Sequence, residues 1–213
     1  MIAAFVLVAF AFQEPQGYRI APVDDTDRDP AFRSFAAKLN RVAVKRDVKG
    51  LKKLVDDEVV TGTGRKGEPE EKGWHAFVAR WRPSERDSIL WETLTDILSL
   101  GCVRMHPRLY VGPYLVWKFP RELDRRRHLV LTKDQLVLRE TPNRDGRPVA
   151  KLAFDVVERM GSVSDDGQWV RVRVNGKEGY VQSQFAHSVA TPRAQFAQQD
   201  AGGWRLVALE VPQ

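Results

Sequence analysis

The feature that most constrains the fold is a change in hydrophobic pattern near residue 129. From there to residue 187, short runs of aliphatic residues alternate with polar ones, and turn residues separate the runs. Alternation with a period of two is typical of strands with one buried face. The strongest turn signal is Asn175-Gly176, because a type I′ hairpin turn needs positive φ at both central residues. The pattern predicts a small antiparallel β unit over residues 129–190.

Three segments of this unit resemble the bacterial SH3 domain family in order and spacing. Leu136-Val137-Leu138-Arg139 with Pro142 is similar to the family's opening Leu-Asn-Val-Arg-x-x-Pro. Trp169-Val170-Arg171-Val172 resembles its Trp-x-x-Val strand, and Asn175-Gly176 followed by Gly179-Tyr180-Val181 resembles its closing Gly-x-x-Gly-Trp/Tyr-Val. The resemblance covers about the last third of the chain. It implies an SH3-like antiparallel β-barrel that serves as a binding or spacer module, and it implies no catalysis.

The sequence departs from the family pattern at two places that frame the ligand groove. Val137 stands where Asn is usual, and Ala153-Phe154-Asp155 replaces a Gly that commonly precedes the third strand. Trp169, Tyr180 and Arg139 are the candidate ligand-binding residues, since together they could line a shallow aromatic groove. Packing within the barrel explains each of the three equally well.

Residues 30–119 show helical spacing and predict a helical domain. Asp47 is placed to cap a short second helix. Glycines and charges between Thr61 and Glu71 predict a surface loop, and the spacing of a phosphate-binding loop is absent. Pro113 argues against a central strand over residues 110–117, which are expected to be extended or loop-like. The apolar stripes comprise Phe32, Phe35, Ala36, Leu39, Val42, Ala43, Trp74, Phe77, Val78, Trp81, Leu90, Trp91, Leu94, Ile97 and Leu98.

The first residues carry the features of an export signal. Residues 2–12 are uncharged and apolar, and Ala9-Phe10-Ala11 gives the small-x-small pattern of a cleavage site. The run is too short for a permanent membrane span. The alternative is a buried N-terminal strand or helix. We expect residues 1–12 to be a signal peptide, residues 13–29 to be a disordered leader, and the protein to be exported to the periplasm or beyond.

Charge favours an anionic partner without choosing one. The formal net charge is +6 and the pI is about 9.6. A basic run, with Arg121, Arg125, Arg126, Arg127 and His128, is interpreted as a solvated connector over residues 120–128. The alternating tail predicts a strand in residues 191–213 that packs on the barrel edge or on the helical domain.

Few residues are placed for catalysis. Cys102 is the sole cysteine and lies in an apolar stretch, where a buried, inert thiol is expected. The histidines are far apart and form no metal-binding pair. Glu92 and Asp96 share a predicted helix face, as two carboxylates of a wall-cleaving glycosidase could, but a solvated face explains them equally well. We therefore expect no enzyme, no metal and no cofactor. The histidines are His75, His106, His128 and His187.

The predicted fold class is α+β, with a helical N-terminal domain followed by the small SH3-like barrel. The predicted function is non-enzymatic binding in the cell envelope, to peptidoglycan or to an envelope protein. The alternative is an accessory protein whose barrel packs internally and has no external ligand. A nucleic-acid partner is not expected, because export argues against it.

Overall fold

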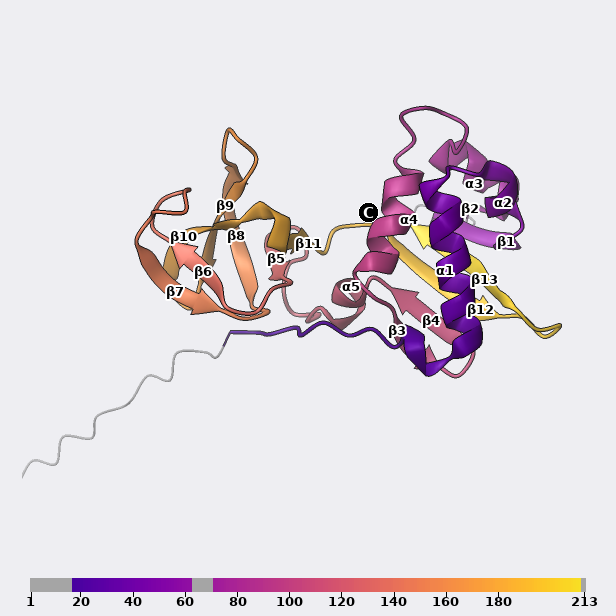
Figure 1. Ribbon diagram of the computed structural model, residues 1–213, viewed down its shortest axis with the longest axis horizontal. Coiled ribbons are helices and arrows are strands. Elements are labelled where there is room, and N and C mark those ends of the chain that lie inside the picture. Colours follow the sequence, from indigo (N-terminus) through magenta and orange to yellow (C-terminus); the bar gives the residue numbers. More distant parts are fainter. Residues whose placement is uncertain (1–16, 63–70, 212–213) are drawn as a thin grey trace, which may run out of the picture.

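The computed structural model describes residues 17–62 and 71–211. These residues form five α-helices and two large β-sheets, which confirms the α+β class (Figure 1). The predicted signal peptide, the first residues of the leader and most of the predicted loop at 61–71 lie outside the described residues.

The first sheet combines strands from both ends of the chain. Its order is β2-β1-β13-β12-β4-β3, and only the β1–β13 pairing is parallel. The tail, predicted to hold one strand packed on the barrel edge or the helical domain, therefore forms two strands at the centre of this sheet. The strands are β1 (Val55–Gly62), β2 (Glu71–Lys72), β3 (Val103–His106), β4 (Leu109–Gly112), β12 (Arg193–Gln198) and β13 (Trp204–Glu210).

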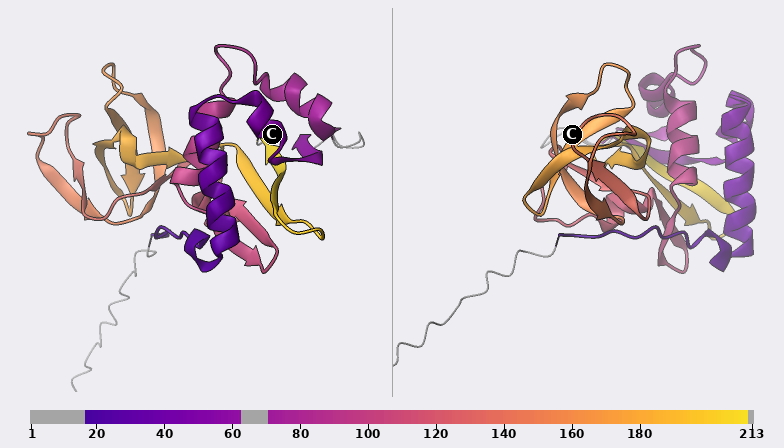
Figure 2. Two further views of the ribbon diagram at one scale, coloured as in Figure 1. Left: turned by 45° about the vertical axis from the view of Figure 1, so that its right-hand side comes forward. Right: turned by 60° about the vertical axis from the view of Figure 1, so that its left-hand side comes forward.

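Helices cover one face of the first sheet, as Figure 2 shows for α1 and α4. Asp29 caps α1 by accepting hydrogen bonds from two backbone N–H groups, and Asp47 caps α2 by accepting one from Gly50 at 2.9 Å, as predicted. The helices here are α1 (Pro30–Val44), α2 (Val48–Lys52), α3 (Gly73–Trp81) and α4 (Leu90–Ser99), with α5 (Tyr114–Lys118) after β4.

Aromatic side chains fill the space between these helices and the sheet. Phe32 of α1 stacks on Tyr110 of β4 with ring centroids 3.7 Å apart. Trp204 of β13 meets Tyr110 edge-on at 5.3 Å. The rings belong to a core that also holds the apolar stripes of α3 and α4. Most residues of the predicted helical stripes are therefore buried, and Val42, Trp74, Val78 and Leu98 are half-buried.

The expectation of a purely helical N-terminal domain is wrong, because residues 55–112 also contribute four strands. In β1, Asp56, Asp57 and Glu58 interrupt the apolar alternation, and the pairing to β13 is irregular there. This irregularity hides the strand from pattern analysis. The expectation of extended or loop structure over residues 110–117 is also wrong, because β4 ends at Gly112 as an interior strand and α5 begins at Tyr114. Pro113 lies between them at the N-cap of the helix, where it interrupts neither element.

The second sheet is built from one continuous segment and is antiparallel throughout. Its order is β11-β5-β8-β9-β10-β6-β7. Asn175 and Gly176 form the predicted hairpin turn with φ of 48° and 72°, and Val174 pairs with Lys177 across it. The strands are β5 (His128–Leu131), β6 (Leu136–Arg139), β7 (Pro148–Leu152), β8 (Val156–Val163), β9 (Trp169–Val174), β10 (Lys177–Gln182) and β11 (Ala186–Ser188).

This sheet is curled but is not the closed barrel that the sequence predicted. Leu129 of β5 and Leu152 of β7 belong to one apolar cluster, although their strands lie near opposite edges of the sheet. The sheet must therefore bend around that cluster. Closure would need pairing between the edge strands β7 and β11, and the described residues include none. Alternation identifies strands and their faces, but it carries no information on closure.

The two sheets share an apolar cluster, and the N-terminal segment ties them together. α5 supplies Tyr114, Leu115 and Val116 to this cluster, and β5 supplies Val130. Figure 1 shows the N-terminal segment running along both sheets.

The leader prediction is wrong for residues 17–29, which make specific hydrogen bonds and include a short 3₁₀ helix, Thr26–Arg28. The carbonyl of Tyr18 accepts a bond from Val156 at 2.7 Å, and the N–H of Asp25 donates to Cys102 at 2.8 Å. Their polar composition suggested disorder, but backbone pairing with both sheets holds them in place.

Candidate ligand-binding site

The predicted site residues lie on three neighbouring strands of the second sheet. Val181 and Val170 point into the apolar cluster, so the alternating residues beside them point outward. Tyr180 of β10 lies opposite Arg139 of β6 on one side and Arg171 of β9 on the other. The local period of two therefore brings an aromatic ring and two guanidinium groups onto one face.

Gly179 permits the close approach of β10 to β6. A Cβ atom at this position would lie 2.5 Å from the carbonyl oxygen of Arg139 and 2.9 Å from Leu138 Cγ. Only glycine fits at that separation without a shift of the backbone. The glycine thereby sets the spacing that places Tyr180 beside Arg139.

A pocket of about 210 Å³ opens beside Arg139 on this face. Trp169 forms part of its wall and is only 5% exposed. The rest of the lining comes from β6, from the end of β10 and from the loops on either side of β6. The lining residues are Lys133, Gln135, Leu136, Val137, Arg139, Arg144, Trp169 and Gln182.

The pocket carries positive charge. Three of its described lining residues are cations, Lys133, Arg139 and Arg144, and none is a carboxylate. Arg139 Nη1 donates to the carbonyl of Gly146 at 2.8 Å, which fixes its guanidinium against the loop after β6. Lys133 Nζ lies 4.3 Å from the centre of the Phe185 ring, a cation–π contact that orients its ammonium group. Such a pocket favours an anionic or hydrogen-bond-accepting ligand.

An ion-pair ladder occupies the neighbouring part of the same face. Arg173 bridges Glu158 and Glu178, at 3.3 and 2.7 Å, and Arg171 adds a second contact to Glu178 at 2.8 Å. Arg127 pairs with Glu158 as well. The hydrogen bond from Arg173 lowers the pKa of Glu178, so this carboxylate stays charged. Both carboxylates on this part of the face are therefore engaged by arginines, whereas the described lining of the pocket holds cations and no carboxylate.

The structure brings two of the three predicted residues into the pocket. Trp169 and Arg139 line it, whereas Tyr180 is half-buried on the same outward face and is not among the lining residues. Lys133, Arg144 and Gln182 were missed. Gln182 shares the outward face with Tyr180 and could have been found by counting two residues along the strand. The two cations lie in loops whose path the sequence pattern does not specify.

Three other candidate residues lie outside the pocket. Cys102 is buried, and burial raises its pKa to about 12, so its thiol is unreactive at neutral pH, as expected. Glu92 and Asp96 lie on α4, and burial and the Glu92 charge raise the pKa of Asp96. Within residues 17–62 and 71–211, no group of three or more potential ligands could hold a metal ion.

Neither the helices nor the search for related proteins adds a candidate site. None of the helices in the described part of the chain is long and apolar enough to cross a bilayer. Comparisons with protein-family models, with curated proteins and with solved structures give no match for this chain.

Proposed function

We propose that the protein is exported and that its second sheet is an SH3-like module that binds peptidoglycan or a protein in the cell envelope. The observation that supports this most directly is the cationic pocket beside Trp169 and Arg139. Its lining strands β6 and β10 lie toward the end of the molecule away from the first sheet (Figure 1). A ligand could reach this pocket without separating the two sheets.

The proposed binding mode follows from the lining side chains. Arg144 is exposed, and its guanidinium would meet an anionic or carbonyl group of the ligand. Gln135 and Gln182 each offer one donor group and one acceptor group for a peptide amide. Trp169 and Leu136 supply an apolar wall. This mixture suits a short peptide with a carboxylate, and no reacting group is needed.

The second candidate is a module that packs internally and has no external ligand. The 5% exposure of Trp169 favours it, because a ring so deeply buried offers little surface to a ligand. Against it, every lining residue of the pocket belongs to the second sheet or its loops. Neither residues 74–119 nor the C-terminal strands contribute to that lining, as internal packing would require.

The test is a pull-down of the full chain on purified peptidoglycan sacculi at low and moderate salt. Arg144→Gln is the informative variant, because this exposed side chain can be changed without disturbing the core. We expect it to reduce retention at moderate salt by about tenfold, since one charge-assisted hydrogen bond contributes about 1.5 kcal/mol. Lys177→Gln, at the distant hairpin turn, is the matched control and should bind normally.

The Trp169→Ala, Tyr180→Ala double variant tests the aromatic contribution, provided that its circular dichroism matches that of the unchanged protein. If Arg144→Gln leaves retention unaltered, or if Lys177→Gln abolishes retention to the same extent, the pocket is not a specific binding site. Internal packing is then favoured. Fractionation of cells that express the full chain tests export, and a protein found only with cytosolic markers would contradict it.

A further inference from the structure

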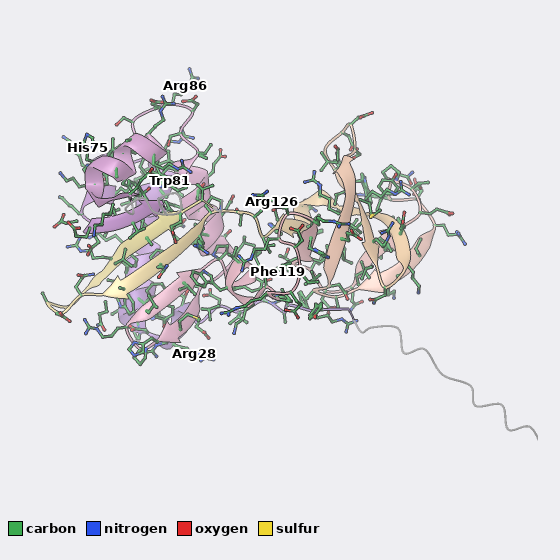
Figure 3. All side chains as sticks on the ribbon, turned by 180° about the vertical axis from the view of Figure 1, so that it is seen from behind. Arg28, His75, Trp81, Arg86, Phe119 and Arg126 are labelled. Carbon is green, nitrogen blue, oxygen red and sulfur yellow. The ribbon has the colours of Figure 1, made fainter. Side chains whose placement is uncertain are left out.

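A second pocket, about 540 Å³ in volume, lies at one end of the first sheet. It opens between the end of α2, the start of β1 and the turn that joins β12 to β13. Figure 3 shows this turn projecting from the side of the molecule away from the second sheet. Small-molecule sites occupy about 300–1,000 Å³, so this pocket has room for a small ligand. Its charged lining residues are Lys52, Lys53, Asp56, Asp57 and Arg205.

Strand pairing places opposite charges on one wall of this pocket. Val55 of β1 pairs in parallel with Leu206 of β13, and both are buried in the core beneath the helices. The N–H of Leu206 donates to the carbonyl of Leu54 at 2.9 Å, which joins the two strands at this end. Because successive side chains of a strand alternate between faces, Asp56 and Arg205 project from the face opposite to the helices. A carboxylate and a guanidinium thus face the same pocket.

The five charged side chains do not neutralise one another by direct contact. Among the described residues, none of them forms an ion pair. Asp56 Oδ1 accepts a hydrogen bond from the N–H of Glu58 at 2.9 Å, which orients its carboxylate. Lys52 Nζ lies 5.9 Å from the ring centre of Trp74, a cation–π contact that holds its ammonium group. A ligand therefore competes with water for these groups, not with an internal salt bridge.

The turn between β12 and β13 forms an ordered wall of the pocket. The N–H of Gln199 donates to the carbonyl of Gly203 at 2.9 Å, and the N–H of Gly202 donates to the carbonyl of Gln199 at 3.0 Å. Gly202 and Gly203 have φ of 84° and 85°, a conformation that glycine adopts without strain. The Gln199 side chain lines the pocket and adds one donor group and one acceptor group.

We propose that this pocket binds a small zwitterion, either a free amino acid or a short peptide with both termini charged. Lys52, Lys53 and Arg205 receive the carboxylate of the ligand, and the two aspartates receive its ammonium group. A ligand with charge of one sign would meet side chains of its own sign in the same pocket, which disfavours it. The site is separate from the pocket at Trp169 and does not depend on what that pocket binds.

The test follows the amide chemical shifts of the full chain, labelled with ¹⁵N, at pH 7 and low salt. The probes are alanine, trialanine, N-acetyl-trialanine, which keeps only the carboxylate, and trialanine amide, which keeps only the ammonium group. We expect trialanine to shift the amides of Lys53, Asp57 and Gly202 saturably, and each single-charge analogue to bind about fivefold more weakly. If alanine binds as tightly as trialanine, the ligand is an amino acid, whereas weaker binding of alanine identifies a peptide.

Two exposed side chains allow the two charges of the ligand to be tested separately. Lys53→Gln should weaken trialanine about fivefold and leave trialanine amide unchanged, because it removes a partner of the carboxylate. Asp57→Asn should weaken trialanine to a similar extent and leave N-acetyl-trialanine unchanged. Arg126→Gln removes one exposed arginine, labelled in the middle of the molecule in Figure 3, and should bind normally.

Melting temperatures of the variants show whether each is folded. If Asp57→Asn melts early, Asp56→Asn provides the same test, because its amide oxygen can still accept the hydrogen bond from Glu58. The proposal is overturned if trialanine causes no saturable shift, or if a single-charge analogue binds as tightly as trialanine. It is also overturned if Arg126→Gln weakens trialanine as much as Lys53→Gln does.

Discussion

The two sheets of this protein are assembled from the chain in opposite ways. Every pairing in the second sheet joins strands within residues 128–188. The first sheet pairs Val55 with Leu206 and Gly112 with Ala194, so it needs both ends of the chain. Local pairings form with a small loss of chain entropy, whereas distant ones cost more before they are stabilised. The second sheet should therefore depend less on the rest of the molecule than the first.

The largest expected effect comes from removing residues 191–213. This truncation takes β12 and β13 out of the centre of the first sheet and removes Phe196, Trp204, Leu206 and Leu209 from its core. We expect hydrogen exchange to show complete loss of protection in β1, β4 and α1. The β9–β10 hairpin should keep most of its protection.

A different outcome would show that the second sheet is not independent of the first. Loss of protection in β9 and β10 along with β4 would mean that the shared cluster around Tyr114 and Val130 makes both sheets one cooperative unit. An isotope-exchange time course on the unchanged protein supplies the reference. The full and the truncated protein must be digested under the same conditions before their exchange is compared.

A smaller effect, about 1–3 kcal/mol of destabilisation, is expected from Gly179→Ala in the second sheet. The added methyl group would collide with the carbonyl of Arg139, which belongs to the neighbouring strand and cannot move freely. Gly161→Ala is a matched control, because a Cβ atom there meets nothing within 4 Å. Urea unfolding should show the control within about 0.5 kcal/mol of the unchanged protein. Equal effects of the two substitutions would argue against a tight contact between β10 and β6.

The smallest expected effect concerns pH at the contact between the two regions. His187 lies on β11, and burial lowers its pKa, although the charge of Asp96 from α4 opposes the shift. The unfolded chain then binds a proton more readily than the folded one. Stability from this group is present above the usual pKa of 6.5 and is lost as the pH falls below it.

The measurement compares the free energy of unfolding at pH 7.5 and pH 5.5. His187→Gln should reduce the loss of stability on acidification, whereas His75→Gln, at an exposed position on α3, should leave it unchanged. An identical pH dependence in all three proteins would show that His187 is solvated in the folded state. It would also argue against close packing of β11 on α4.

The sequence predicted the elements whose signal is local. The hairpin at Asn175-Gly176 follows from the φ angles that its turn needs, and the stripes of α1 and α4 follow from helical periodicity. β1 was missed because three consecutive acidic residues break its alternation. In the candidate site, Trp169 and Arg139 were found through strand pattern and resemblance. Lys133 and Arg144 were not, because loops have no periodic signal.

By itself, the sequence determined which segments have a buried face, where the tightest turn lies and that the protein carries excess positive charge. Only the tertiary structure decided that β12 and β13 lie at the centre of the first sheet, that the second sheet stays open, and that Arg193 meets Glu210 beside Trp117 of α5. The reason is physical. Periodicity records the burial of each residue along its own segment, whereas strand order and the meeting of distant charges depend on contacts between segments far apart in the chain.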